Sequence, residues 1–160
     1  MGRVSPTSFT DSDSQWNSEE LIYDGNTETG ADSYNGTDRT WGSFIELNIG
    51  EISCDSIGFY AYYNALDINS VDIDLYYNST WNNLYEGIYD NQTWVEKVIG
   101  STQNLTAARV RFYAKKAATA YLYEFEFSSI GAQKYYKEIG SSLIFIKKIR
   151  RKIRKIVGTN

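Results

Sequence analysis

The sequence of 160 residues predicts an all-β protein, an antiparallel β-sandwich, followed by a basic amphipathic α-helix at its C-terminus. Three observations predict this fold class. Several segments alternate apolar and polar residues with a period of two, which is typical of strands with one buried face. Turn-forming residues separate these segments, and no helical pattern interrupts them. Aromatic residues, which are favoured in strands, make up 16% of the chain.

The elements are expected in the following order. Residues 1–20 are polar without a sustained period, which predicts an extended lead-in anchored by Trp16. Residues 24–42 concentrate Gly, Asn, Asp and Thr, which predicts a long structured loop. Strands are predicted at 43–49, 57–63, 70–77, 93–99, 106–114 and 120–127, with turns at 48–51 (NIGE), 77–80 (YNST), 90–93 (DNQT) and 100–104 (GSTQN).

Two of the predicted strands carry paired carboxylates. Asp72 and Asp74 alternate with apolar residues in 70–77, and Glu124 and Glu126 alternate with aromatic residues in 120–127. The period of two predicts that these side chains lie on solvated strand faces, with Tyr121, Tyr123, Phe125 and Phe127 together on the other face. The alternative is a hydrolase that uses two carboxylates.

The composition argues against most enzyme classes. The chain has no histidine and a single cysteine, which excludes Ser-His and Cys-His pairs, histidine- or paired-cysteine zinc sites and any intrachain disulfide. Cys54 is predicted to be a small buried side chain. The first ten residues lack the pattern of a signal peptide, and no apolar run reaches the length of a membrane span. We therefore expect a non-catalytic protein.

The net charge of −4 hides a sharp division, which predicts two domains. Residues 1–132 hold 7 Lys and Arg against 19 Asp and Glu, a net charge of −12, whereas residues 133–160 hold 9 against 1, a net charge of +8. The spacing of isoleucines in the second segment predicts a helix with a basic opposite face. The residues expected to meet a partner there are Ile146, Ile149, Ile153, Ile156, Arg150 and Arg151.

The isoleucine stripe of residues 133–160 predicts a partner, because an isolated helix of this length is marginal in water. We favour docking into a homo-oligomer or larger assembly, since the spacing suits a helical seam and the body is acidic. Binding to a membrane surface is the first alternative. Nucleic-acid binding and a disordered tail are weaker alternatives, and the acidic body is unlike a nucleic-acid-binding surface.

Six segments, taken in order, resemble those of discoidin, or coagulation-factor C-type, domains. They are LIYDGNTETG, SFIELNIGE, IGFYAYY, VDIDLYYNSTWNNL, AARVRFYA and YLYEFEF, and the likeness covers roughly residues 16–128. The resemblance implies a galactose-binding-like jelly roll, generally non-catalytic, whose loops at one end bind glycans, lipid head groups or proteins. The chain departs from the family at Gly30-Ala31, where a tryptophan is common, and lacks its frequent disulfide.

The resemblance also implies a structural calcium ion where the DGN loop meets the closing strand. The matching positions are Asp24, Asn26, Thr29 and Glu124. Ca²⁺ takes six to eight oxygen ligands, and Gly25 allows the tight turn that would present them. The alternative is a plain Asx-turn beside a solvated glutamate.

The loops opposite the termini are the candidate binding surface. The residues expected there are Tyr34, Arg39, Trp41, Tyr62 and Tyr63. Aromatic planes with Arg and Asn nearby suit a sugar ring, whereas the alternative is that these aromatics plug the end of the sandwich. Two function classes follow: a carbohydrate-binding adhesion module with a glycan or cell-surface ligand, or a structural subunit of a virion or surface filament. Both predict an extracellular, cell-surface or virion location.

Overall fold

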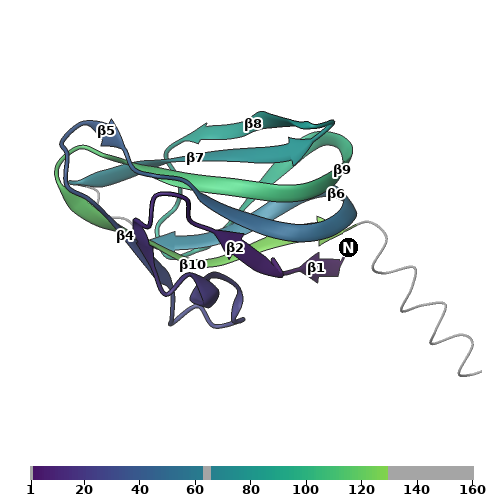
Figure 1. Cartoon of the computed structure of the whole chain (residues 1–160), viewed down its shortest axis with the longest axis horizontal. Helices are drawn as coiled ribbons and strands as arrows, with labels where there is room; N and C mark the ends of the chain where they lie inside the picture. The colour runs from purple at the N-terminus through teal and green to yellow at the C-terminus, as the bar shows by residue number, and fades with distance from the viewer. Residues whose placement is uncertain (1, 63–65, 130–160) are drawn as a thin grey trace, which may run out of the picture.

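The computed structural model describes residues 2–62 and 66–129, and in these ranges the prediction of an all-β antiparallel fold is confirmed (Figure 1). The strands are β1 (Gly2–Val4), β2 (Ser8–Thr10), β3 (Trp16–Asn17), β4 (Ala31–Asn35), β5 (Thr40–Trp41), β6 (Ile45–Tyr62), β7 (Ile68–Tyr77), β8 (Thr80–Gly87), β9 (Trp94–Ala114) and β10 (Ala118–Ser129). A short 3-10 helix, η1 (Glu19–Tyr23), lies against β10.

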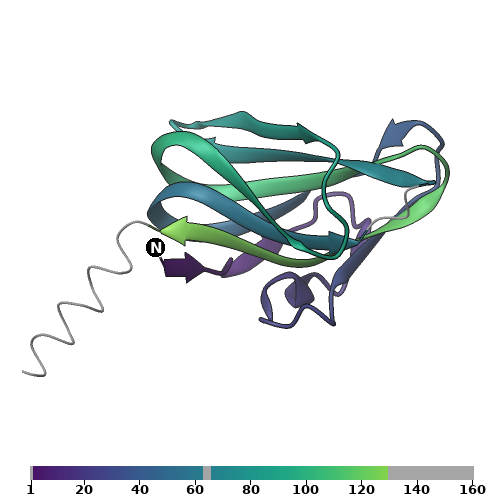
Figure 2. The same ribbon diagram turned by 180° about the vertical axis from the view of Figure 1, so that it is seen from behind.

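The hydrogen-bonded sheet folds over into two layers. Layer I consists of β3, β4, β10, the C-terminal half of β6 and the N-terminal half of β9, with β1 added to β10. Layer II consists of β2, the N-terminal half of β6, the C-terminal half of β9, β7 and β8, with β5 added to β9. Both long strands bend from one layer into the other at the end where β1 lies, as the view from behind shows (Figure 2).

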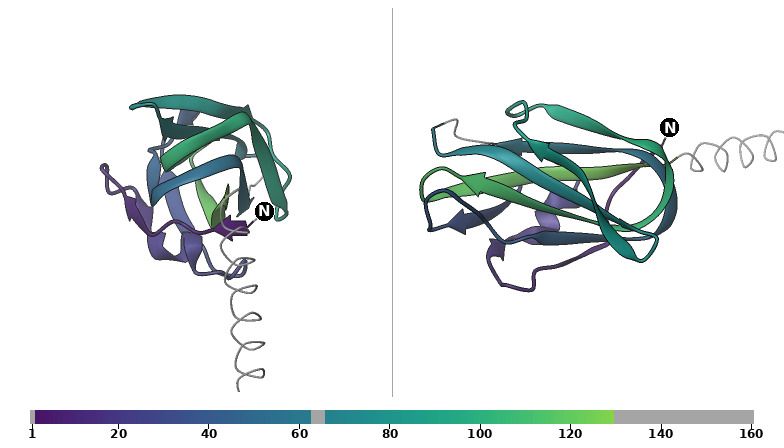
Figure 3. Two further views of the ribbon diagram at one scale, coloured as in Figure 1. Left: turned by 90° about the vertical axis from the view of Figure 1, so that its right-hand side faces the viewer. Right: turned by 90° about the horizontal axis from the view of Figure 1, so that it is seen from above.

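The bends replace two predicted turns. We expected NIGE and GSTQN to end strands, but β6 and β9 stay paired through both segments, from Ile45 opposite Val110 to Tyr60 opposite Trp94. The register shifts twice on the way, between Asn48 and Ile52 and between Cys54 and Ser56. Such irregularities bend a strand without ending it, so the sequence pattern of a turn marks a corner here (Figure 3).

The other turn predictions are confirmed. Asn78 and Ser79 both have positive φ, 52° and 62°, and join β7 to β8 in a tight hairpin. Residues 90–93 form the connection from layer II back to layer I. β8 was not predicted, because its residues show no clean alternation of apolar and polar side chains. The prediction of a loop over 24–42 is wrong in part, since β4 and β5 form within that segment.

A one-residue bulge in β10 changes which side chains of that strand face the core. The prediction that Tyr121, Tyr123, Phe125 and Phe127 share one face is therefore wrong. Leu122 is opposite Ala61 and Glu124 is opposite Tyr60, so Tyr123 is the extra residue. The inserted residue shifts the alternation by one position. Leu122, Phe125 and Phe127 therefore point into the core, while Tyr121 remains on the outer surface together with Tyr123.

The core between the layers is aliphatic and aromatic. Trp16 is 5% exposed, as expected of an anchor for the lead-in, and the predicted burial of Cys54 is confirmed. The largest fully buried side chains include Phe59, Phe125, Phe127, Ile22, Ile45, Leu47, Ile57, Ile68, Ile73, Leu75, Leu105 and Leu122. Every one of them lies before residue 128.

The predicted basic helix of 133–160 and its partner residues lie outside the described residues, as does Tyr63. No helix within the described part of the chain is long and apolar enough to cross a membrane.

Because β10 supplies the last of the large buried side chains of the core, we expect the sandwich to fold without residues 133–160. A protein truncated after residue 132 should show one cooperative thermal transition and a β-type circular dichroism spectrum. An unfolded or helical spectrum from the truncated protein would contradict the proposed boundary.

Candidate functional site

A cleft opens at the end of the sandwich away from β1, where β5, β7, β8 and β9 meet. Its lining residues are Trp41, Ser70, Glu86, Gly87 and Tyr113, and its volume is about 240 Å³. Trp41 pairs with Tyr113 in the ladder between β5 and β9, and their rings meet edge to face at 5.4 Å. The cleft therefore combines two aromatic rings at an angle with a hydroxyl and a carboxylate.

Two arginines on β9 hold the aromatic side chains around this cleft. The Arg111 guanidinium lies 5.0 Å from the Trp41 ring and 4.2 Å from Phe44. The Arg109 guanidinium also lies 4.2 Å from the Phe44 ring, and it lies 4.6 Å from the Trp81 ring. The result is a ladder of alternating rings and guanidinium groups on the outer surface of layer II, because cations are attracted to aromatic faces.

Buried carboxylates anchor the ladder. Arg111 Nε and Nη2 each lie 2.8 Å from Asp72 Oδ2, and Arg109 Nε and Nη2 lie 2.8 and 2.7 Å from Asp74 Oδ2. Asn83 Nδ2 donates to the remaining oxygens, at 2.8 Å to Asp72 and 3.1 Å to Asp74. Each of the two aspartates thus accepts hydrogen bonds through both of its carboxylate oxygens.

The prediction of a solvated face for Asp72 and Asp74 is wrong, since they are only 3% and 7% exposed. The register places Asp72 opposite Arg111 and Asp74 opposite Arg109, and the aromatic rings cover the pairs. Buried charges require such partners. The sequence does carry a signal for these ion pairs, namely the Asp-x-Asp spacing on one strand and the Arg-x-Arg spacing on another. This spacing predicts the pairs only when the two strands are known to be neighbours.

The five predicted ligand residues do not form one surface. Trp41 lines the cleft, and exposed Arg39 lies two residues before it with φ at 57°. Tyr62 instead contacts Tyr121 on the outer surface of layer I, with ring centroids 5.9 Å apart. Tyr34, on β4 of layer I, is 58% exposed. Sequence reasoning missed Tyr113, Ser70 and Glu86, which the sheet brings to Trp41.

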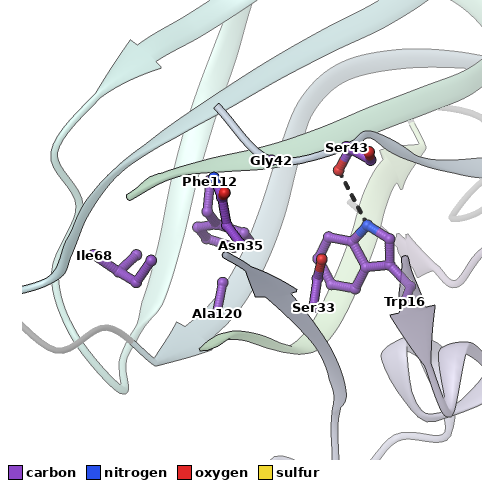
Figure 4. Close-up of a pocket in the computed structure, with 8 residues that line it drawn as sticks. All are labelled: Trp16, Ser33, Asn35, Gly42, Ser43, Ile68, Phe112 and Ala120. Carbon is purple, nitrogen blue, oxygen red and sulfur yellow. Dashed lines mark hydrogen bonds between the residues drawn. The ribbon is translucent and has the colours of Figure 1, made fainter. Parts of the chain in front are cut away.

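A second, enclosed space lies beneath Trp16 and is too small for a ligand. Trp16 Nε1 donates to the Ser43 carbonyl oxygen at 3.1 Å, and Phe112 and Ala120 close the space from the far side (Figure 4). Its volume of about 10 Å³ corresponds to at most one water molecule. The Trp16 side chain therefore plugs this part of the sandwich.

The four predicted calcium positions do come together. The Asn26 N–H donates to Asp24 Oδ1 at 2.8 Å and to Glu124 Oε1 at 2.7 Å. Thr29 Oγ1 donates to Asp24 Oδ2 at 2.7 Å. The bulge at Tyr123 turns Glu124 outward toward this loop, where the loop buries it to 2% exposure. The prediction of a solvated face is therefore wrong for Glu124 too. Glu126, two residues further along β10, instead pairs with Arg3 at 3.3 Å.

The two carboxylates of this loop have opposite pKa shifts. The hydrogen bond from Thr29 is the main cause that lowers the pKa of Asp24. Burial, followed by the hydrogen bond with Asp24, raises the pKa of Glu124 to about 7. Within residues 2–62 and 66–129, neither carboxylate forms an ion pair with a lysine or an arginine. The pair therefore has the oxygen chemistry and the uncompensated negative charge that suit a hard divalent cation.

This donor set is small. Among residues 2–62 and 66–129 no three Asp, Glu, His or Cys side chains are grouped closely enough to hold a metal. A cation here would draw on the two carboxylates, the Thr29 hydroxyl and oxygens of Asn26, which is a mixture that Ca²⁺ accepts.

Comparison with known proteins shows the fold. No family model and no curated protein matches the sequence. Among solved structures, a pectin-binding carbohydrate-binding module has a TM-score of 0.58 at 14% identity, covering 79% of this chain and 94% of its own. An F5/8 type C domain from Bacteroides fragilis has a TM-score of 0.57 at 11% identity, covering 78% and 93%. The family 32 carbohydrate-binding module of Clostridium perfringens NanJ, solved with galactose, has a TM-score of 0.54 at 17% identity, covering 78% and 92%.

These neighbours are discoidin-like domains and carbohydrate-binding modules that share a jelly-roll β-sandwich. The chain has this fold over the residues that the structure describes, which confirms the structural part of the resemblance.

The raised pKa of Glu124 predicts a pH-dependent stability in metal-free protein. The folded state holds the Glu124 proton up to about pH 7, whereas the unfolded chain loses it near the ordinary glutamate pKa of 4.5. The stabilisation is therefore complete below the unfolded pKa and is lost as the pH rises through about 7. At about 1.4 kcal/mol per pKa unit, the loss amounts to about 3 kcal/mol.

Chemical denaturation in chelator between about pH 5 and 8 measures this loss. Glu124→Gln should remove this part of the slope, since the amide mimics the protonated acid and keeps an acceptor for the Asn26 N–H. Equal slopes for wild type and variant would show that Glu124 ionises normally.

Proposed function

We propose that the protein is a non-catalytic carbohydrate-binding module that holds a sugar ring in the Trp41 cleft. The observation that carries the proposal is the pair of rings, Trp41 and Tyr113, set at 66° beside Ser70 and Glu86. A sugar ring presents an apolar face to an aromatic plane and hydroxyls to polar groups at its edge. A cleft with a few polar groups among rings is the usual form of such a site.

The ladder beneath the cleft supports this proposal, because a rigid site binds at a lower entropic cost. Asp72 holds Arg111 through two short contacts, and Arg111 in turn contacts the Trp41 ring. The indole is thus in contact with both Arg111 and Tyr113.

A catalytic role for the buried aspartates is a poor fit to their contacts. A general acid or base needs an oxygen that can reach the substrate. Asp72 and Asp74 use both oxygens on Arg109, Arg111 and Asn83 and lie beneath the rings of the ladder.

The solved neighbours favour a glycan as the ligand. They include a pectin-binding module, a module in complex with 4,5-unsaturated mannuronic acid and one in complex with galactose. Among the described residues that line the Trp41 cleft, Glu86 is the one with a charged side chain, which favours a neutral sugar over an acidic one. We also propose display outside the cell or on a particle, with the basic segment 133–160 as the part that docks into an assembly; the charge division in the sequence supports this.

We further propose that the loop of residues 24–29 binds a structural calcium ion. Asp24 and Glu124 would hold it, with Thr29 and the oxygens of Asn26 as further ligands. The ion would supply the positive charge that these carboxylates lack and would connect the loop to β10. The support is the convergence of the donors and the raised pKa of Glu124.

Calcium should therefore raise the melting temperature of the wild type, and more at about pH 8 than at about pH 5, because binding requires ionised Glu124. Asp24→Ala should abolish the increase. Asp38→Ala, which removes an exposed loop carboxylate elsewhere, is the matched control and should retain it. A melting temperature that calcium leaves unchanged at both pH values would show that the loop is metal-free.

For the cleft, we expect Trp41→Ala to lower the affinity for the best neutral sugar found on a glycan array by about tenfold. Loss of an aromatic stack costs about 1 kcal/mol or more, and 1.4 kcal/mol corresponds to a factor of ten. Trp81→Ala is the matched control, because Trp81 stacks on Arg109 in the same ladder but does not line the cleft. Equal losses in the two folded variants, measured by calorimetry, would place the ligand elsewhere.

A further inference from the structure

The outer surface of layer I carries a continuous group of aromatic rings, here called the tyrosine strip. It crosses three neighbouring strands and consists of Tyr121 and Tyr123 on β10, Tyr60 and Tyr62 on β6 and Trp94 on β9. Ring centroids are 5.9 Å apart for Tyr62–Tyr121 and Tyr60–Tyr123, and 6.0 Å apart for Tyr60–Trp94. The strip lies in the layer opposite the ladder of layer II, and none of its members lines the Trp41 cleft.

The bulge in β10 limits the strip to two rings of that strand. Tyr121 and Tyr123 are two residues apart, so regular alternation places both on the outer surface, and the extra residue then turns Phe125 and Phe127 into the core. The rings of Tyr121 and Tyr123 are nearly parallel, at 19°, with centroids 6.4 Å apart. All four tyrosines stay partly exposed, and Trp94 is 43% exposed. A layer whose interior is already filled has no packing need for five large rings on its outer surface.

The tyrosines of the strip also bring phenol hydroxyl groups to this surface. Burial raises the pKa of Tyr123, and the nearby phenols of Tyr121, Tyr62 and Tyr60 raise it further. Each phenol hydroxyl can donate and accept a hydrogen bond. The strip thus combines apolar planes with hydroxyl groups, which is the chemistry that a carbohydrate chain matches.

The surroundings of the strip are acidic. Asp32, which is partly exposed, is opposite Tyr121 in the ladder between β4 and β10. On the far side, Glu96 and Glu126 share the single guanidinium of Arg3, which also lies 5.4 Å from the Trp94 ring. The charged groups around the strip are therefore predominantly negative, in keeping with the charge of −12 on residues 1–132. Such a surface attracts cations and repels polyanions.

We propose that the tyrosine strip is a second glycan-binding surface, for an extended chain of amino sugars that carry free, protonated amines. The sugar faces would stack on the rings across the three strands, and the amines would lie near Asp32 and Glu96 at its two sides. A short neutral sugar suits the small Trp41 cleft, whereas a row of rings across three strands suits a chain. The two surfaces bind independently, so this inference does not depend on the function proposed for the cleft.

The test uses the full-length protein and a glucosamine oligomer, measured by calorimetry at about pH 6. We expect binding that weakens as the salt concentration rises, because the attraction is partly ionic. The N-acetylated oligomer of the same length, which has no charge, should bind at least about tenfold more weakly. Each lost stack of about 1.4 kcal/mol corresponds to a factor of ten, so Tyr62→Ala/Tyr121→Ala should lower the affinity at least about tenfold.

Three matched variants keep the result interpretable. Tyr62→Phe/Tyr121→Phe retains the rings and should retain most of the affinity, even if the alanine double variant proves unstable. Asp32→Asn should reduce the salt dependence without changing the fold. Trp41→Ala should leave binding of the glucosamine oligomer unchanged.

Several outcomes would overturn the proposal. They are no binding of the oligomer by folded wild type, equal binding of the N-acetylated oligomer, unchanged affinity in the folded alanine double variant, and loss of binding in Trp41→Ala alone. The last result would assign the amino sugar to the cleft. Loss of neutral-sugar binding in Trp41→Ala, with the oligomer unaffected, supports both surfaces, so failure of one is distinguishable from failure of the other.

Discussion

The pairing of β6 with β9 is the constraint on which the rest of the structure depends. These two strands remain hydrogen-bonded from Ile45–Val110 in layer II to Tyr60–Trp94 in layer I, so a single antiparallel pair supplies the centre of both layers. β7 and β10 then add to opposite parts of this pair. Because the same two strands turn the corner together, the spacing of the layers and the register on both outer surfaces are set at once.

The outer surface of layer II shows what this register produces. β9 brings Arg109 and Arg111 opposite Asp74 and Asp72 on β7, and β5 adds Trp41 over the second pair. Salt bridges with one exposed partner often contribute little to stability. Here the pairs have a positional role, because they hold the guanidinium groups flat against the rings. A polar array on the outside of a sheet thus orients the aromatic wall of the cleft.

The outer surface of layer I depends on one inserted residue. Tyr123 shifts the alternation of β10, which turns Phe125 and Phe127 inward while Tyr121 and Tyr123 stay on the surface. The same shift places Glu124 beside the DGN loop. The candidate calcium site and the limit of the tyrosine strip along β10 are therefore consequences of a single irregularity.

The all-β class, most strand positions, the Trp16 anchor and the convergence of Asp24, Asn26, Thr29 and Glu124 could be predicted from sequence, because periodicity, turn residues and a family pattern are local properties. Tertiary structure was needed for the rest. The buried state of Asp72 and Asp74 depends on which strand lies beside β7, and the faces of β10 depend on a bulge that leaves no mark in the sequence. Trp41 was found by its type, but Tyr113, Ser70 and Glu86 join it only through pairing across the sheet. Register between distant strands is a property of the folded sheet, so no window along the chain contains it.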